Sequence, residues 1–163
     1  MDDFFSDWPV EVVVRPPPLG RCLAATREIS PGEVLLAEKP ALQTQPQNEE
    51  QIDDPCAVLR AYCAAPPDVR SLVVDSLATI EYDERGGTSA KAREAAEQVA
   101  ASEDWAGGHS VETLQRAIMA FRLNGHSFGD SSALFPHLCK MQHSCSPNAI
   151  YQVTTAAATD NLP

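Results

Sequence analysis

Short apolar runs separated by turn-forming residues characterise the first 42 residues. Residues 10–14 are rich in valine, and residues 22–26 and 34–39 form two further short runs. Runs of this kind, bounded by Pro and Gly, are typical of strands. The Pro and Gly residues between the runs supply the turns. We therefore predict three strands that form a small antiparallel sheet.

Apolar residues recur at helical spacing in the middle of the chain. This spacing predicts helices over residues 55–65, 67–82, 89–102 and 110–122. Pro55 and Pro67 stand at helix starts, where a missing N–H costs nothing, and Ser110 is a favourable cap. Residues 43–54 are polar and are expected to form an exposed loop. The Ala-, Lys- and Glu-rich helix over residues 89–102 is expected at the surface.

The helical pattern ends after Asn124. We predict an irregular segment there, followed by a last strand over residues 149–154. Strands, a helical stretch and a final strand together indicate an α+β fold with small antiparallel sheets. The same order divides the chain into three parts, residues 1–42, 43–123 and 124–163.

The charge balance limits the partners that the chain can take. The 163 residues include 23 acidic and 12 basic side chains, which gives a formal charge of −11 at pH 7. A protein that binds the nucleic-acid backbone carries a basic face, so we expect no direct contact with nucleic acid. The acidic balance is compatible with a basic or Lys-containing protein partner.

The cysteine count and the N-terminus bear on the cellular compartment. Five Cys, an odd number, are scattered without the regular spacing of a disulfide framework. This usage favours a reducing compartment, the cytoplasm or the nucleus. No signal peptide is recognisable in the acidic N-terminal residues, and no apolar run has the length of a membrane span. We therefore expect no membrane association.

Potential metal ligands are concentrated in residues 134–149, which we call the signature segment. It contains His137, Cys139, His143 and Cys145 in the order H-x-C-x3-H-x-C. All four are ligand types that zinc accepts. Four ligands drawn from nine residues would strain tetrahedral geometry, so we do not expect a complete local zinc site.

The signature segment and its neighbour contain two further patterns with a chemical interpretation. Residues 125–129 read G-H-S-F-G, which matches the G-x-S-x-G nucleophile elbow of hydrolases. That elbow needs a strand before it and a helix after it, whereas here a helix is predicted before it, so we interpret the match as chance. Cys145 follows His143 by two residues, but a buried structural Cys is a more common role than a nucleophile.

Three segments, in this order, resemble the SET domain of protein lysine methyltransferases. Residues 20–40 resemble the family's opening motif, residues 122–128 resemble its short Asn-containing element, and residues 134–149 resemble its N-H-S-C-x-P-N signature. The likeness is greatest to the branch with a split SET domain, the SET-and-MYND type. It implies small sheets in two SET halves, residues 1–42 and 124–163, with a helical insertion over residues 43–123.

The resemblance also implies S-adenosylmethionine as methyl donor and a protein lysine, of histone type, as acceptor. Residues expected in the donor pocket come from all three motifs: Gly20, Arg21, Cys22, Asn124, Cys139, Met141, Gln142 and His143. Cys145 corresponds to a structural zinc ligand in the branch that has a zinc-binding tail. Its other ligands would come from a Cys-rich segment that follows the SET core.

The chain departs from the family pattern at several positions. Cys22 stands for the second Gly of the opening turn, Gln142 stands for the signature Asn, and Gly125 replaces an apolar residue. No MYND zinc cluster is present between the two halves, and no residues up to Pro163 match the family's segment with the catalytic Tyr. Two hypotheses follow: a lysine methyltransferase that is incomplete or inactive as this chain, and a non-catalytic SET-derived module that binds proteins.

Overall fold

The computed structural model describes residues 7–17, 19–44, 54–77, 88–102, 104–128 and 131–152. The chain forms two compact units. One unit comprises Met1–Lys39 with His137–Pro163, and the other comprises Pro40–Pro136. Small antiparallel sheets and helices make up these units, which confirms the predicted α+β class.

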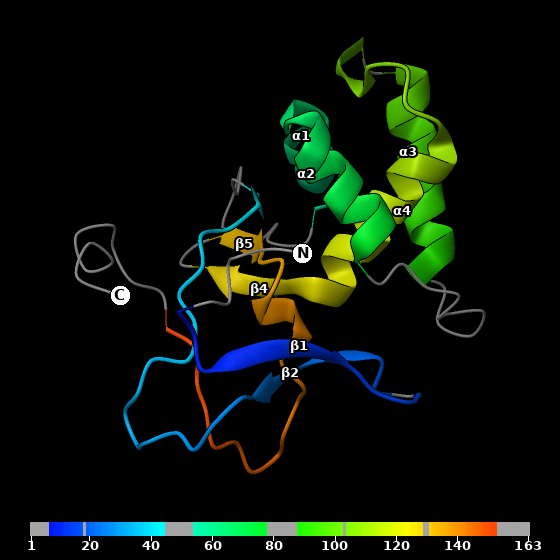
Figure 1. The fold of residues 1–163 in the computed structure, drawn as a ribbon. Coiled ribbons are helices and arrows are strands. Elements are labelled where there is room, and N and C mark those ends of the chain that lie inside the picture. Colours follow the sequence, from blue (N-terminus) through cyan, green and yellow to red (C-terminus); the bar gives the residue numbers. More distant parts are fainter. Residues whose placement is uncertain are drawn as a thin grey trace. The chain divides into compact units, whose positions relative to one another are not determined.

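The first unit contains a two-stranded antiparallel sheet. Strands β1 (Val10–Val14) and β2 (Arg21–Ala25) pair with Val12 opposite Leu23, as predicted for the first two strands (Figure 1). The turn between them is closed by the Arg15 N–H, which donates to the Gly20 carbonyl oxygen at 2.7 Å. Gly20 has a φ of 59°, a left-handed conformation that L side chains rarely adopt.

The predicted third strand over residues 34–39 is wrong, because these residues form no regular structure. The turn before them is held by side chains: the Ser30 N–H donates to Glu33 Oε2 at 3.1 Å, and Glu33 also forms an ion pair with Arg27. A short apolar run becomes a strand only where a partner strand pairs with it. The predicted last strand is also wrong over residues 149–152, and residues 153–154 lie outside the described part.

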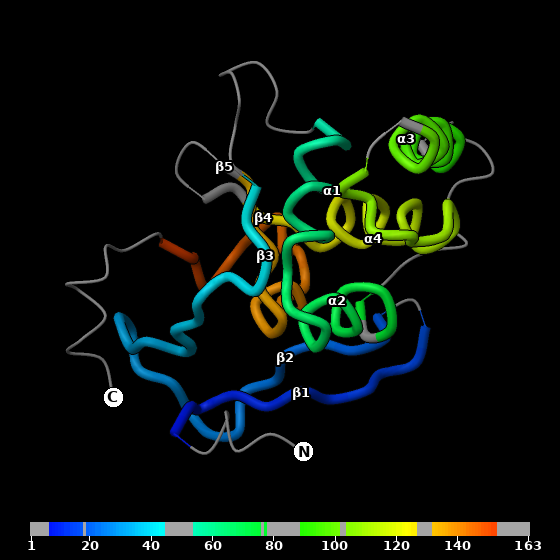
Figure 2. The backbone as a smooth tube through the Cα atoms, turned by 90° about the horizontal axis from the view of Figure 1, so that it is seen from above, coloured from blue at the N-terminus to red at the C-terminus, as the bar shows by residue number. Residues whose placement is uncertain are grey.

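The second unit is mainly helical (Figure 2). It contains helices α1 (Pro55–Ala64), α2 (Pro67–Ser71), α3 (Thr88–Ser102) and α4 (Val111–Asn124), with a π-helical turn, η2 (Leu72–Ser76), and a 3-10 turn, η3 (Asp104–Ala106). Pro55 occupies the first turn of α1, and the Ser110 hydroxyl accepts from the Thr113 N–H at the start of α4, as predicted. The helix predicted over residues 67–82 changes to the π-helical turn at Leu72, and residues 78–82 lie outside the described part.

The core of this unit lies where α4 meets α1 and α3. Leu114, Ala117, Ile118 and Phe121 of α4 are buried, at the helical spacing that predicted this helix, and Val111 is half-buried. Helix α3 is more than a surface helix, because Ala92, Ala96 and Val99 along one of its faces are also buried. No helix in the described ranges is long and apolar enough to cross a bilayer.

A three-stranded antiparallel sheet lies beside the helices in the same unit. Strand β5 (Ser131–Leu134) is central, between β3 (Leu42–Gln43) and β4 (Gly125–Phe128). The buried Thr44 hydroxyl donates to the Ser132 carbonyl oxygen at 3.1 Å and accepts from the Ser132 N–H at 3.2 Å. The irregular segment predicted after Asn124 is wrong over residues 125–128 and 131–134, because these residues form β4 and β5.

Gly125 joins α4 to β4 at a point with no room for a side chain. A Cβ built there would lie 2.6 Å from the Phe121 carbonyl oxygen and 3.3 Å from the Phe121 ring. Real Cβ atoms do not approach a backbone oxygen that closely, so a larger residue would force the strand away from the helix end. This contact explains why position 125 requires Gly in this backbone conformation.

Candidate functional site

The first unit brings the turn of the β1–β2 hairpin close to the signature segment. The 3-10 turn η4 (Leu138–Lys140) contacts strand β2. Just beyond it, the Gln142 side-chain amide donates to the Leu19 carbonyl oxygen at 3.4 Å. Strand β2, which carries Arg21 and Cys22, therefore contacts the turn that carries Cys139, and Gln142 reaches the residue before Gly20.

The backbone at Gly20 borders open space. A Cβ built on Gly20 meets no atom within 4 Å, so the positive φ, not crowding, is what disfavours other residues there. The two residues that follow alternate across β2, with Arg21 exposed and Cys22 buried. Cys22 is only 7% exposed, and its expected place in the donor pocket stays a prediction.

Burial changes the titration of two side chains on η4. It raises the pKa of the Cys139 thiol, and the Lys140 ammonium group nearby opposes this rise. Burial also lowers the pKa of the Lys140 ammonium group, and the positive charge of Arg21 acts in the same direction. Two cationic side chains, Lys140 and Arg21, and one anionic side chain, Glu38, therefore act on Cys139.

We expect the native thiols to react at very different rates. Cys145 is exposed, whereas Cys22 is buried and Cys139 is half-buried, with a thiol pKa that burial raises above its ordinary value. Because the thiolate is the reactive form, Cys145 should be alkylated at least roughly tenfold faster than Cys139. Mass mapping after brief iodoacetamide treatment at pH 7.5 measures both rates. The alkylation rates of the same thiols in the unfolded chain serve as the reference. Equal rates for Cys139 and Cys145 in the native protein would contradict the partial burial of Cys139.

Glu38 joins the end of the opening motif to the start of the signature segment. Its carboxylate accepts from the backbone N–H of His137 at 3.1 Å and from that of Leu138 at 3.0 Å. His137 Nδ1 lies 2.7 Å from Glu38 Oε1. Glu38 lies within the opening motif, residues 20–40, but its role depends on partners about 100 positions away in sequence.

Asn124 is the last residue of α4 and belongs to the second unit. Its side-chain nitrogen donates to the Ala120 carbonyl oxygen at 2.7 Å, one turn back in the same helix. This side-chain hydrogen bond supplies a further donor to the carbonyl groups at the C-terminal end of α4. The expected role of Asn124 in the donor pocket stays a prediction.

His143 and Cys145 form a local pair at the exposed end of the signature segment. His143 Nε2 lies 3.3 Å from Cys145 Sγ. Within the residues that the structure describes, no three His, Cys, Asp or Glu side chains come together as metal ligands would. His137, the first of the four zinc-type residues, contacts Glu38 instead. The assignment of Cys145 as a zinc ligand stays a prediction.

The G-x-S-x-G match lies at a helix-to-strand junction. Helix α4 ends at Asn124, and the next four residues form β4. A nucleophile elbow has the opposite order, with the Ser in a sharp turn between a strand and the helix that follows it. The backbone around Ser127 therefore lacks the geometry that activates a serine in hydrolases.

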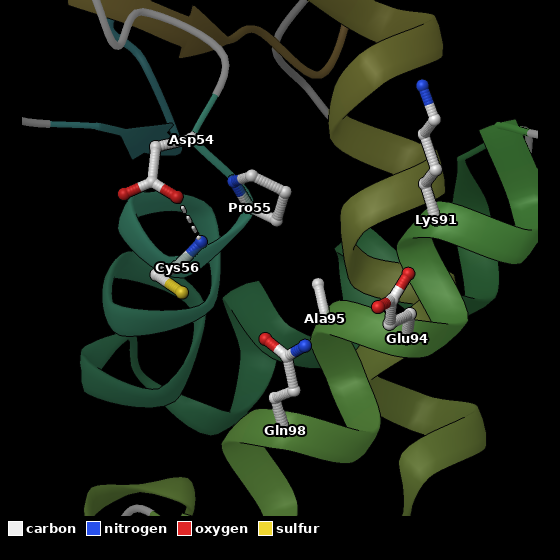
Figure 3. Close-up of a pocket in the computed structure, with 7 residues that line it drawn as sticks. All are labelled: Asp54, Pro55, Cys56, Lys91, Glu94, Ala95 and Gln98. Atoms are coloured by element: carbon white, nitrogen blue, oxygen red, sulfur yellow. Dashed lines mark hydrogen bonds between the residues drawn. The ribbon is translucent and has the colours of Figure 1, made fainter.

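A cavity of about 250 Å³ opens in the second unit between the start of α1 and the side of α3 (Figure 3). Its lining mixes charged, polar and apolar residues: Asp54, Pro55, Cys56, Lys91, Glu94, Ala95 and Gln98. The Asp54 carboxylate already accepts from the Cys56 N–H at 3.0 Å, as the cap of α1. None of the predicted site residues lines this cavity.

Comparison with known proteins identifies the family. The model of the SET domain matches residues 20–161, which is most of the chain, and the chain therefore belongs to the SET-domain family. Membership implies S-adenosylmethionine as methyl donor and a lysine-containing protein as substrate. Neither the curated proteins nor the solved structures include a significant match.

Proposed function

We propose that this member of the SET-domain family binds S-adenosylmethionine between the β1–β2 turn and the signature segment, for methyl transfer to a protein lysine. The observation that carries the proposal is the approach of Gln142 to Leu19, together with the contact between η4 and β2. These contacts link the two motifs that the SET resemblance assigns to one pocket. The proposed pocket residues are Gly20, Arg21, Cys22, Cys139, Met141, Gln142 and His143, with Asn124 as a further candidate.

The chemistry of these residues suits the donor. The open space at Gly20 lets a ligand approach the backbone, and the Arg21 guanidinium group can pair with the carboxylate of the methionine moiety. The Gln142 amide offers both a donor and an acceptor for short polar contacts. When bound, S-adenosylmethionine supplies the electrophilic methyl group that a lysine amine accepts.

We also propose that the chain has the split-SET arrangement of the SET-and-MYND branch. The helices α1, α2 and α3 and nearly all of α4 lie within residues 43–123, the proposed insertion between the halves 1–42 and 124–163. The formal charge of −11 favours a basic substrate such as a histone tail. A substrate of this kind would place the protein in the nucleus or the cytoplasm.

The proposed activity predicts methyl transfer to a lysine-rich protein. Incubation with histones and donor carrying a labelled methyl group should label lysine, and the label should be absent when the substrate lysines are acetylated, because acetylation removes the nucleophilic amine. Mass spectrometry of the substrate identifies the modified residue. Donor binding without transfer to any basic protein would contradict the activity but not the binding site.

A second candidate is a non-catalytic module that binds a protein through the SET scaffold. The observation that favours it is the formal charge of −11, which suits a basic protein partner whether or not a donor is bound. A folded chain that binds basic peptides but not S-adenosylmethionine would favour this candidate over the enzyme.

A further inference from the structure

We infer that Glu38 is a positioning residue for the proposed donor site, because it holds the start of the signature segment against the end of the opening motif. The inference rests on the proposed function, because it assigns Glu38 a role in holding that site together. Glu38 itself is not proposed to touch the donor.

The contacts of Glu38 are dense and buried. Its carboxylate accepts from two consecutive backbone N–H groups, those of His137 and Leu138. The His137 ring adds a third contact, with Nδ1 2.7 Å from Glu38 Oε1. The Glu38 side chain is 7% exposed, and a carboxylate buried to this extent is stable only with such partners.

Glu38 takes the place of a local cap for η4. The first N–H groups of a helical turn have no partner within the turn. His137 stands at the cap position, but its side chain makes no capping hydrogen bond. The carboxylate of Glu38 supplies the missing acceptor from a position 99 residues earlier in the chain. The start of the signature segment is therefore anchored to the end of the opening motif.

This anchor precedes the proposed pocket residues directly. Cys139 lies in the capped turn itself, and Met141 and Gln142 follow it, with Gln142 reaching the Leu19 carbonyl oxygen. Loss of the anchor would free residues 137–142 to move relative to Leu19 and Gly20. Because ligand affinity depends on preorganised contacts, the donor should then bind more weakly even though no residue that contacts it has changed.

The test compares Glu38→Gln with the native chain in two independent measurements. Hydrogen exchange measures the protection of the backbone amides of His137 and Leu138, and calorimetry measures the affinity for S-adenosylmethionine. We expect faster exchange at both amides and roughly tenfold weaker donor binding, the effect of losing charge-assisted hydrogen bonds.

Glu38→Asp keeps the carboxylate on a shorter arm and should have an intermediate effect. Glu11→Gln, which changes an exposed carboxylate on β1, is the matched control and should change neither quantity.

The outcomes separate this inference from the proposed function. Donor binding that is equal in the native chain and in Glu38→Gln sinks the inference alone, whether or not exchange accelerates. No donor binding by the native chain sinks the proposed function and this inference with it. If Glu38→Gln does not fold, His137→Ala serves instead, because it removes the ring contact and leaves both backbone contacts. It should weaken donor binding by a smaller factor, and unchanged binding would overturn the inference.

Discussion

Replacing Leu114 by Ala is expected to lower the free energy of unfolding by about 3 kcal/mol. Leu114 is completely buried, on the face of α4 that packs among the other helices. The truncation removes apolar surface from the core and leaves a cavity that the neighbouring backbone cannot close. A loss of this size is a large fraction of the roughly 5–15 kcal/mol that stabilises a typical domain.

Leu123 provides the matched control on the same helix. Its side chain is 42% exposed, so Leu123→Ala should cost less than about 1 kcal/mol. Urea unfolding followed by far-ultraviolet circular dichroism measures both variants. Equal losses for the two substitutions would mean that α4 does not bury the face assigned to it.

The second large effect is expected at Gln142. Gln142→Ala removes the amide that approaches Leu19, and with it a polar contact proposed for the donor. We expect the dissociation constant for S-adenosylmethionine to rise by roughly tenfold or more, since a binding group and part of the preorganisation are lost together. Unfolding stability should change little, because the Gln142 side chain is exposed.

Gln98→Ala is the control for this prediction. Gln98 is also exposed, and it lines the separate cavity beside α3 in the second unit. Its removal should leave the donor dissociation constant unchanged. An unchanged affinity in Gln142→Ala would exclude Gln142 from the donor site and move attention to the remaining proposed residues.

The helices were predictable because their signals are local. The Pro at the start of α1, the Ser110 cap and the apolar spacing of α4 each involve residues within a few positions of one another. The strands β4 and β5 were not predictable, since their residues include few β-branched side chains. They form because β5 pairs with Leu42 and Gln43, about 90 positions earlier, and sequence periodicity does not carry that information.

The candidate site shows the same division between local and distant signals. The family motifs pointed to Gly20 and Gln142, and the structure brings their neighbourhoods together within one unit. The buried orientation of Cys22 depends on its register in β2, opposite Val13, and no motif predicted it. The role of Glu38 was not predictable for a similar reason, because its partners become neighbours only after folding.

Calorimetric titration of the purified chain with S-adenosylmethionine tests the central claim most directly. Circular dichroism on the same sample should first establish that the helices are formed. We predict saturable binding that the double substitution Gln142→Ala, His143→Ala abolishes while the helical signal persists. A folded chain that releases no heat of binding, at donor concentrations well above those that methyltransferases need, would contradict the account.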